Sequence, residues 1–267
     1  MDDLTNAGAA PCRHAEPVMG TVVSFTLRHR RTPGLRAALD RAVALLHAVD
    51  QEFSPYLPES AVSRLRRGES GRADTTPAVR RVLELCDVAH SRTRGAFDIW
   101  VDGRPDPCGL VKGWAAQRAW RVLREAGGTD ACVNAGGDVR VGGAPGAAGL
   151  WSTGIADPRN PGQLLTVVTG RDQAIATSGT TERGNHIIDP RTRTPATELL
   201  AATVTGPDLM WADVYATAAM VLGAREAHQW ITALPGYSLL TVATTGEVRA
   251  SVDFPFASSR RSSSPGG

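Results

Sequence analysis

The sequence predicts an α+β protein in which a mainly antiparallel sheet packs against helices. In the first half of the chain, apolar residues recur at a spacing of three and four, which is the pattern of amphipathic helices. The second half carries short runs rich in β-branched residues, which are typical of strands. These runs follow one another too closely for the crossovers that parallel strands need, so we expect mainly antiparallel pairing.

The helices are predicted from their ends as well as from their apolar stripes. Proline occupies the first position of the helices that begin at Pro33 and Pro77, while Ser60 and Thr76 stand where a capping side chain is expected. Gly223 closes a later helix. The predicted helices cover residues 33–50, 61–67, 77–94, 111–126, 209–222 and 225–233.

The strands are predicted within a single domain. The chain has 267 residues, 42% of them hydrophobic, which is enough for a full core, and no linker divides it. The domain is expected to span 16–256, between disordered ends at 1–15 and 257–267. Strands are predicted over 18–27, 131–141 with a Gly-Gly turn inside, 150–155, 164–169, 174–177 and 201–205, with a buried fragment at 186–188 and a C-terminal hairpin.

Composition excludes several classes of function. The formal net charge is +2 and the arginines are scattered, which does not favour a nucleic-acid surface. The four cysteines are widely spaced and predict neither a zinc site nor a disulfide framework. No stretch approaches the roughly 20 apolar residues of a membrane span, and the N-terminal residues resemble neither a signal peptide nor a lipoprotein leader. We expect a soluble, cytoplasmic protein.

Lys112 is the only lysine beside 28 arginines. Because the chain otherwise uses arginine throughout, this exception suggests a site that needs a compact ammonium group. The alternative is a single lysine codon without functional meaning. Lys112 is predicted in the first turn of its helix, where a cation opposes the helix dipole and a bound anion would offset the cost.

Two further patterns are candidates for chemistry. His186 lies in a short apolar run that the turn at Asp189 and Pro190 ends, and it is either a general base or a hydrogen-bonded core histidine. Asp213 and Thr217 are four residues apart on a predicted helix, so their oxygens can share one cation. The alternative is that the threonine bonds to its own backbone and the aspartate is solvated.

Seven short motifs occur in the order in which one enzyme family carries them. The motifs are Met19-Gly-Thr21, Gly95-Ala-Phe-Asp98, the loop 106–113, Asn134-Ala-Gly-Gly-Asp138, Thr177-Ser-Gly179, His186-Ile-Ile-Asp-Pro190 and Ala212-Asp-Val-Tyr-Ala-Thr217. Together they resemble the FAD:protein FMN transferases, the ApbE-type flavin transferases. The resemblance implies a T-fold-like packing of sheet and helices. It also implies transfer of FMN from FAD to a threonine or serine hydroxyl of an acceptor flavoprotein, with release of AMP.

The resemblance also implies a role for particular residues. Asp213, Thr217 and the backbone carbonyl of Gly109 are implied to hold Mg²⁺, which makes Asp213 a catalytic residue together with the general base His186. Contacts with FAD are implied for Met19, Tyr56, Ala96, Phe97, Asp98, Asp106, Lys112 and Ile187.

The sequence departs from the family pattern at two places. Pro107 and Cys108 replace the smaller residues that usually precede the metal-binding carbonyl, and Arg193 stands where the family commonly has glycine. Both departures affect the conformation of a loop rather than the chemistry of the site.

Two other functions remain open from the sequence. A magnesium-dependent FAD pyrophosphatase, which releases free FMN and AMP, needs the same site. A flavin-binding protein without catalysis would tolerate the loss of Asp213, Thr217 and His186, all of which are present.

Overall fold

The computed structural model describes residues 11–28, 32–101, 103–145, 149–180 and 187–257. Its centre is an eight-stranded sheet in which every neighbouring pair is antiparallel. The strand order is β1 (Cys12–Val18), β2 (Thr21–Leu27), β5 (Ala131–Ala135), β6 (Asp138–Gly142), β9 (Gln173–Gly179), β12 (Leu199–Gly206), β13 (Ser238–Ala243) and β14 (Val248–Ala250). The predicted fold class is confirmed.

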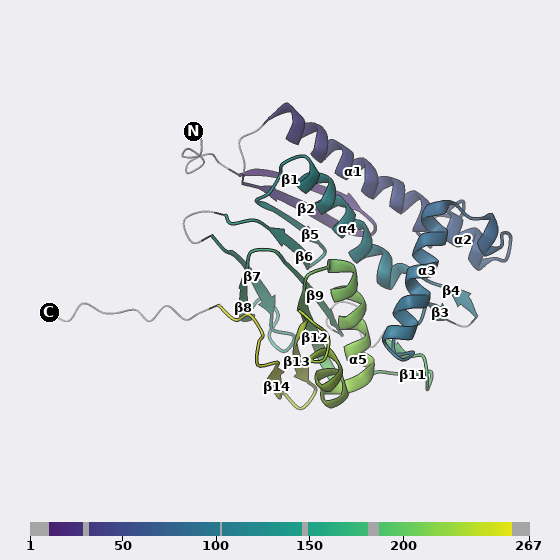
Figure 1. The fold of residues 1–267 in the computed structure, drawn as a ribbon. Coiled ribbons are helices and arrows are strands. Elements are labelled where there is room, and N and C mark those ends of the chain that lie inside the picture. Colours follow the sequence, from purple (N-terminus) through teal and green to yellow (C-terminus); the bar gives the residue numbers. More distant parts are fainter. Residues whose placement is uncertain (1–10, 29–31, 102, 146–148, 181–186, 258–267) are drawn as a thin grey trace.

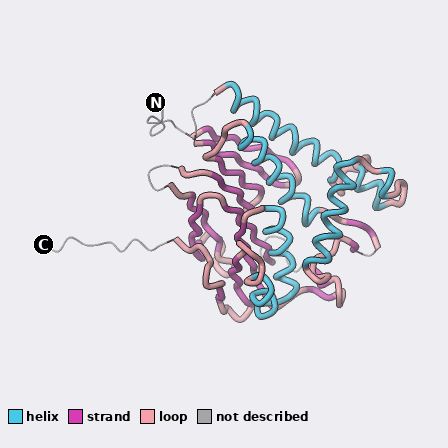
Figure 2. Tube along the Cα trace, viewed as in Figure 1, coloured by secondary structure: helices cyan, strands magenta, loops and turns pink. Residues whose placement is uncertain are grey.

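Helices cover one face of this sheet (Figure 1). Three long helices lie across it: α1 (Pro33–Phe53), α4 (Cys108–Glu125) and α5 (Leu209–Ile231). At one end stand the short helix α2 (Ala61–Arg66), a 3₁₀ turn (Arg72–Asp74) and α3 (Pro77–Arg92). Figure 2 shows the same two layers by type of secondary structure. Along the described chain, no helix is long and apolar enough to cross a membrane.

Three two-stranded pairs complete the fold. They are β3 (Trp100–Val101) with β4 (Arg104–Pro105), β7 (Trp151–Ala156) with β8 (Leu164–Gly170), and β10 (Ile188–Asp189) with β11 (Thr194–Pro195). The β7–β8 pair contributes Ile155 and Val168 to a small second core that also contains Ile175 of β9. The neighbours of Ile175, Ala174 and Ala176, belong to the main core, because successive strand residues point to opposite faces.

The main core lies between the sheet and the long helices. The side chains of Val23, Phe25 and Leu27 alternate along β2 and are all buried. They pack with Leu46 of α1 and Leu123 of α4, both fully buried. Burial of such side chains from both layers is the main stabilising contribution of this part of the fold.

The structure corrects the predicted N-terminus. Residues 12–15, predicted as disordered, form the first half of β1, because they pair antiparallel with β2. Met19 and Gly20 form the turn between the two strands, both with positive φ, so the predicted strand at 18–27 is divided. At the other end, the backbone N–H of Ala257 donates to the carbonyl of Val167.

Two helix predictions also change. The helix predicted from residue 111 begins at Cys108, with Pro107 at its cap, so Lys112 lies in the second turn rather than the first. The argument that Lys112 opposes the dipole in the first turn is therefore wrong. The helices at 209–222 and 225–233 are confirmed as two parts of α5, separated by Gly223 with φ of 76°.

Helices α4 and α5 lie in close contact at Gly113. A Cβ atom at Gly113 would lie 3.0 Å from the Cβ of Asp213, the carbonyl oxygen of Leu209 and the Cα of Met210. Two of these three atoms are backbone and cannot move aside independently. The absence of a side chain at Gly113 thus sets the distance between the two helices.

We expect Gly113→Ala to lower the free energy of unfolding by about 1–3 kcal/mol, because the added methyl group overpacks a fixed backbone contact. Urea denaturation measures the change. Gly34→Ala is the matched control, since a methyl group added at Gly34 in α1 would meet no atom within 4 Å and alanine favours helix. Equal effects of the two variants would contradict the packing argument.

Candidate functional site

In the described part of the chain, two buried carboxylates and a half-buried ammonium meet between the sheet and helices α4 and α5. We call Lys112, Asp138 and Asp213 the charge cluster. The Lys112 ammonium forms an ion pair with Oδ2 of Asp138 and lies 3.9 Å from Oδ1 of Asp213. Asp138 is 1% exposed and Asp213 is 4% exposed. Two carboxylates in the core thus share one ammonium.

Asp213 is the less satisfied of the two carboxylates. Its Oδ2 atom is buried and has no hydrogen-bond partner among the described residues. Burial raises the pKa of Asp213 to about 7, against the lowering effect of the Lys112 ammonium, and the negative charge of Asp138 adds to the rise. A cation beside Oδ2 would remove this electrostatic cost.

Hydroxyl groups surround the carboxylates. Thr217 lies one helical turn after Asp213 on α5, and its hydroxyl is 3.0 Å from the hydroxyl of Ser178 at the end of β9. The backbone N–H of Thr177 donates to Oδ1 of Asp138 over 3.0 Å. The Thr-Ser-Gly motif of β9 therefore contacts both the carboxylate of β6 and the polar face of α5.

Gly109 is in the first turn of α4 and packs closely on the ring of Phe97. A Cβ atom at Gly109 would lie 3.3 Å from Cε2 of Phe97. In a regular helix its carbonyl points toward the N–H of Gly113, the residue that packs on Asp213. The Gly109 carbonyl is thus directed toward the turn of α4 that faces the charge cluster.

The predicted FAD-contacting residues Asp98 and Asp106 lie near the ends of α3 and α4. Oδ1 of Asp106 accepts from the N–H of Cys108 over 3.1 Å, and Oδ2 pairs with Arg66 at 2.9 Å. Oδ1 of Asp98 accepts from the N–H of Trp100 over 3.0 Å, and Oδ2 lies 3.6 Å from Nδ1 of His90. These contacts fix the orientation of both carboxylates.

The other residues with a predicted role differ widely in exposure. Tyr56 is 88% exposed, whereas Ala96, Phe97 and Ile187 are buried. Ile188, predicted within a buried fragment at 186–188, is 42% exposed, and it forms a two-residue strand with Asp189, the residue predicted to end the fragment. His186 lies outside the described residues.

The turn after this strand contains Arg193, which stands where the family commonly has glycine. Asp189 accepts from the backbone N–H, Nε and Nη2 of Arg191, at 2.9–3.0 Å. These hydrogen bonds lower the pKa of Asp189. Arg193 then adopts a φ of 61°, in the left-handed region that glycine occupies most easily. The structure thus gives a backbone reason for glycine at this position.

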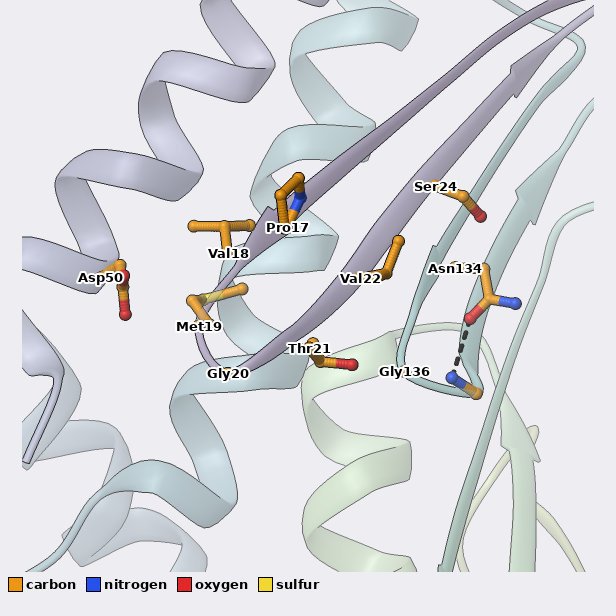
Figure 3. A pocket seen from close by; sticks show the side chains of 11 residues that line it. Pro17, Val18, Met19, Gly20, Thr21, Val22, Ser24, Asp50, Asn134 and Gly136 are labelled. Carbon is orange, nitrogen blue, oxygen red and sulfur yellow. Dashed lines mark hydrogen bonds between the residues drawn. The ribbon is translucent and has the colours of Figure 1, made fainter. Parts of the chain in front are cut away.

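A pocket of about 870 Å³ opens beside the turn of the β1–β2 hairpin (Figure 3). Its lining includes Met19, Thr21 and Asn134, of which Asn134 accepts a hydrogen bond from the N–H of Gly137 over 2.8 Å. Gly136 and Gly137 also line it, and the next residue is Asp138 of the charge cluster. The lining does not include the cluster itself, so the β5–β6 turn is the part of the chain that connects the two.

The donor atoms around Asp213 fit a magnesium ion. In the described residues, no group of three or more His, Cys, Asp and Glu side chains is placed to hold a metal. Magnesium does not require such a cage, since it prefers one or two carboxylates and completes its shell with other oxygens, waters and substrate phosphates. The unpartnered Oδ2 of Asp213 is a carboxylate oxygen of this kind, and Thr217 carries a hydroxyl oxygen one turn later on α5.

Asp138 has no role that the sequence alone predicts. It is visible there only as the last residue of the Asn134-Ala-Gly-Gly-Asp138 motif, because nothing local marks its side chain as buried. The signal that could have identified it is an aspartate directly after a Gly-Gly turn. In a two-residue hairpin, that position lies opposite a core residue of the preceding strand.

The fold and the charge cluster define an α+β protein with a buried acidic site between a large antiparallel sheet and its covering helices. The ApbE family model matches residues 19–104 and 103–240. Because these two matches cover most of the chain, the protein belongs to the ApbE family.

Relatives with known names agree with this membership. The chain is 24% identical to the FAD:protein FMN transferase of Vibrio cholerae. The alignment has 276 positions and covers 78% of this chain and 80% of that protein. It is 32% identical to the FAD:protein FMN transferase of Rhodobacter capsulatus over 148 residues, 52% of this chain. This match spans only 28% of the Rhodobacter protein. The match to a relative of the same name from Klebsiella pneumoniae spans 38% of that relative.

Solved structures share the fold. The ApbE protein of Thermotoga maritima superposes with a TM-score of 0.80 at 21% identity, over 91% of this chain and 97% of that one. The flavin transferase ApbE of Vibrio cholerae gives a TM-score of 0.80 at 22% identity, over 93% of this chain and 100% of that one.

We expect Lys112→Met to lower the free energy of unfolding by about 3 kcal/mol in a chelating buffer, since it leaves buried carboxylates without their ammonium. The double variant Lys112→Met, Asp138→Asn should regain much of this loss, because one of the carboxylates is then neutral. A double-mutant cycle from urea denaturation gives the coupling energy. Additive effects of the two substitutions would contradict the ion pair.

Proposed function

We propose that this protein transfers the FMN part of FAD to a threonine or serine hydroxyl of an acceptor flavoprotein in the cytoplasm, with release of AMP. Membership of the ApbE family and the names of the relatives support this activity. The observation that carries the proposal is the charge cluster: a buried carboxylate oxygen without a partner, beside the only lysine of the chain.

FAD binding is assigned to residues on both sides of the charge cluster. The Lys112 ammonium supplies positive charge for the pyrophosphate, which favours a compact cation or an arginine fork over neutral groups. Met19, in the wall of the pocket of about 870 Å³, contributes an adaptable apolar surface. The remaining contacts are assigned to Tyr56, Ala96, Phe97, Asp98, Asp106 and Ile187.

Asp213, the Thr217 hydroxyl and the Gly109 carbonyl are the residues that would hold magnesium. When bound, magnesium neutralises negative charge on the phosphoryl groups and positions them. The protein's own contribution is to keep the Asp213 carboxylate buried and open at Oδ2. Ser178 holds the hydroxyl of Thr217 in place from the neighbouring strand.

The transfer itself exchanges the phosphoanhydride bond of the FAD pyrophosphate for a phosphoester bond to the acceptor. The acceptor oxygen forms a bond to the phosphorus of the FMN half of FAD, and the bond from that phosphorus to the AMP oxygen breaks. His186 is assigned as the base that takes the proton of the acceptor hydroxyl, since the unperturbed pKa of histidine suits this role near neutral pH. The positive charges around the pyrophosphate stabilise AMP as the leaving group.

The first test concerns the metal. Asp213→Asn should lower FMN transfer by at least about 10²-fold, because the proposed set loses its only carboxylate. Millimolar Mg²⁺ should raise the Tm of the wild type, as a ligand of the native state does, but not the Tm of the variant. Asp172→Asn, at an exposed aspartate paired with Arg124, is the matched control. An equal Mg²⁺ response of wild type and Asp213→Asn would remove Asp213 from the metal site.

The second test concerns the base. His186→Ala should lower transfer by about 10² to 10⁴, the usual contribution of a general base, while FAD and Mg²⁺ still bind. Wild-type transfer should fall at acid pH as the imidazole becomes protonated, and the residual rate of the variant should lack that fall. The control is His47→Ala. His47 lies on α1 and pairs with Glu16 of β1.

One assay serves both tests. Each form is incubated with FAD, Mg²⁺ and a flavin-acceptor domain, and covalent flavin on the acceptor is followed by in-gel fluorescence. His186→Ala with wild-type labelling would exclude His186 from the mechanism. A wild type that produces only free FMN and AMP with every acceptor would establish the pyrophosphatase instead.

A further inference from the structure

Asp138 is held in the core by the turn that precedes it. It is the first residue of β6, and the turn Gly136-Gly137 places it directly opposite Ala135 of β5. Both glycines have positive φ, 60° and 99°, which lets a two-residue turn join the strands. Ala135 is fully buried, and Asp138 lies on the same face, toward α4 and α5. The backbone of this turn therefore places the Asp138 side chain in the core, independently of its side-chain partners.

Each oxygen of Asp138 has its own partner. Oδ1 accepts from the backbone N–H of Thr177 on β9 over 3.0 Å, and Oδ2 forms the ion pair with Lys112. The Thr177 bond comes from strand backbone, so it holds the carboxylate in one orientation. Asp138 thus presents a fixed negative charge to a flexible lysine side chain.

Lys112 lies between two possible partners and is closer to one of them. Its ammonium pairs with Asp138 and stays 3.9 Å from Oδ1 of Asp213. If Asp138 lost its charge, Asp213 would be the nearest charged carboxylate among the described residues, and in a site of low dielectric the ammonium would be drawn from 3.9 Å to a direct ion pair with it. The ammonium would then neutralise the Asp213 carboxylate from the Oδ1 side and repel a metal ion at Oδ2 of the same carboxylate.

We propose that Asp138 is a positioning residue, which holds the Lys112 ammonium against the sheet and so keeps the Asp213 carboxylate open to a divalent cation. This inference rests on the magnesium site of the proposed function. It assigns to Asp138 an effect on metal affinity although Asp138 is not itself one of the proposed ligands.

The charges of the cluster support this role. Counted over the described members of the charge cluster, two carboxylates and one ammonium leave one negative charge, and Oδ2 of Asp213 has no hydrogen-bond partner among the described residues. A buried net charge is unfavourable unless a counter-charge is present. One divalent cation reverses the sign and leaves the site positive, as an anionic pyrophosphate requires.

The test measures Mg²⁺ binding to the FAD-free protein by calorimetric titration. Asp138→Asn should weaken Mg²⁺ binding on the order of tenfold, the change expected when an ammonium moves from 3.9 Å to hydrogen-bonding distance of Asp213 at an effective dielectric of about 20. The double variant Lys112→Met, Asp138→Asn should recover wild-type affinity, since the competing ammonium is gone. Asp172→Asn should bind as the wild type does.

A purely structural role for Asp138 would not produce that recovery. If Asp138→Asn does not fold by circular dichroism, Lys112→Met alone carries the test, and it should bind Mg²⁺ at least as tightly as the wild type. Unchanged affinity in Asp138→Asn, a loss that Lys112→Met fails to restore, or weaker binding by Lys112→Met alone would each overturn the inference.

The same titration separates this inference from the proposed function. A wild type that binds no Mg²⁺ overturns the metal site and the role of Asp138 together. The Mg²⁺ affinities of the variants can also follow the expected order in a protein that labels no acceptor. That result would support the role of Asp138 and overturn only the transfer activity.

Discussion

The burial of two carboxylates beside a single ammonium is the constraint on which the rest of the structure depends. Charged groups are stable in a protein core only when partners from several elements compensate them. Here Lys112 comes from α4, Asp213 from α5 and Asp138 from β6. The three elements must approach closely, and the absence of a side chain at Gly113 permits this between the two helices.

The same constraint links the charge cluster to the pocket. The turn Gly136-Gly137 contributes to the wall of the pocket and leads directly into Asp138. A Cβ atom at Gly136 would lie 2.5 Å from the hydroxyl oxygen of Thr21, another residue of that wall. One short turn therefore contributes to the wall of an open pocket and also fixes the position of a buried charge.

Much of the secondary structure was predictable, because its signals are local. Proline marked the start of α1 and α3, Ser60 and Thr76 marked the caps of α2 and α3, and Gly223 marked the end of the first part of α5. The errors lie where such signals are weak. Residues 12–15 have no strong strand pattern and become ordered by pairing with β2. The start of α4 was misplaced because Cys108 and Gly109 are weak helix formers, and their turn is supported by the Asp106 carboxylate, which accepts from the N–H of Cys108.

The sequence by itself determined the α+β class, the family resemblance, and the candidates Lys112, Asp213 and Thr217, because spacing along a helix and the choice of one lysine are local properties. Only the tertiary structure decided which charges meet. Asp138 is separated from Lys112 by 26 positions and from Asp213 by 75, and no periodicity connects them. Their contact arises because a tight turn, a strand and two helices converge, and the electrostatic properties of the site follow from burial that only this packing creates.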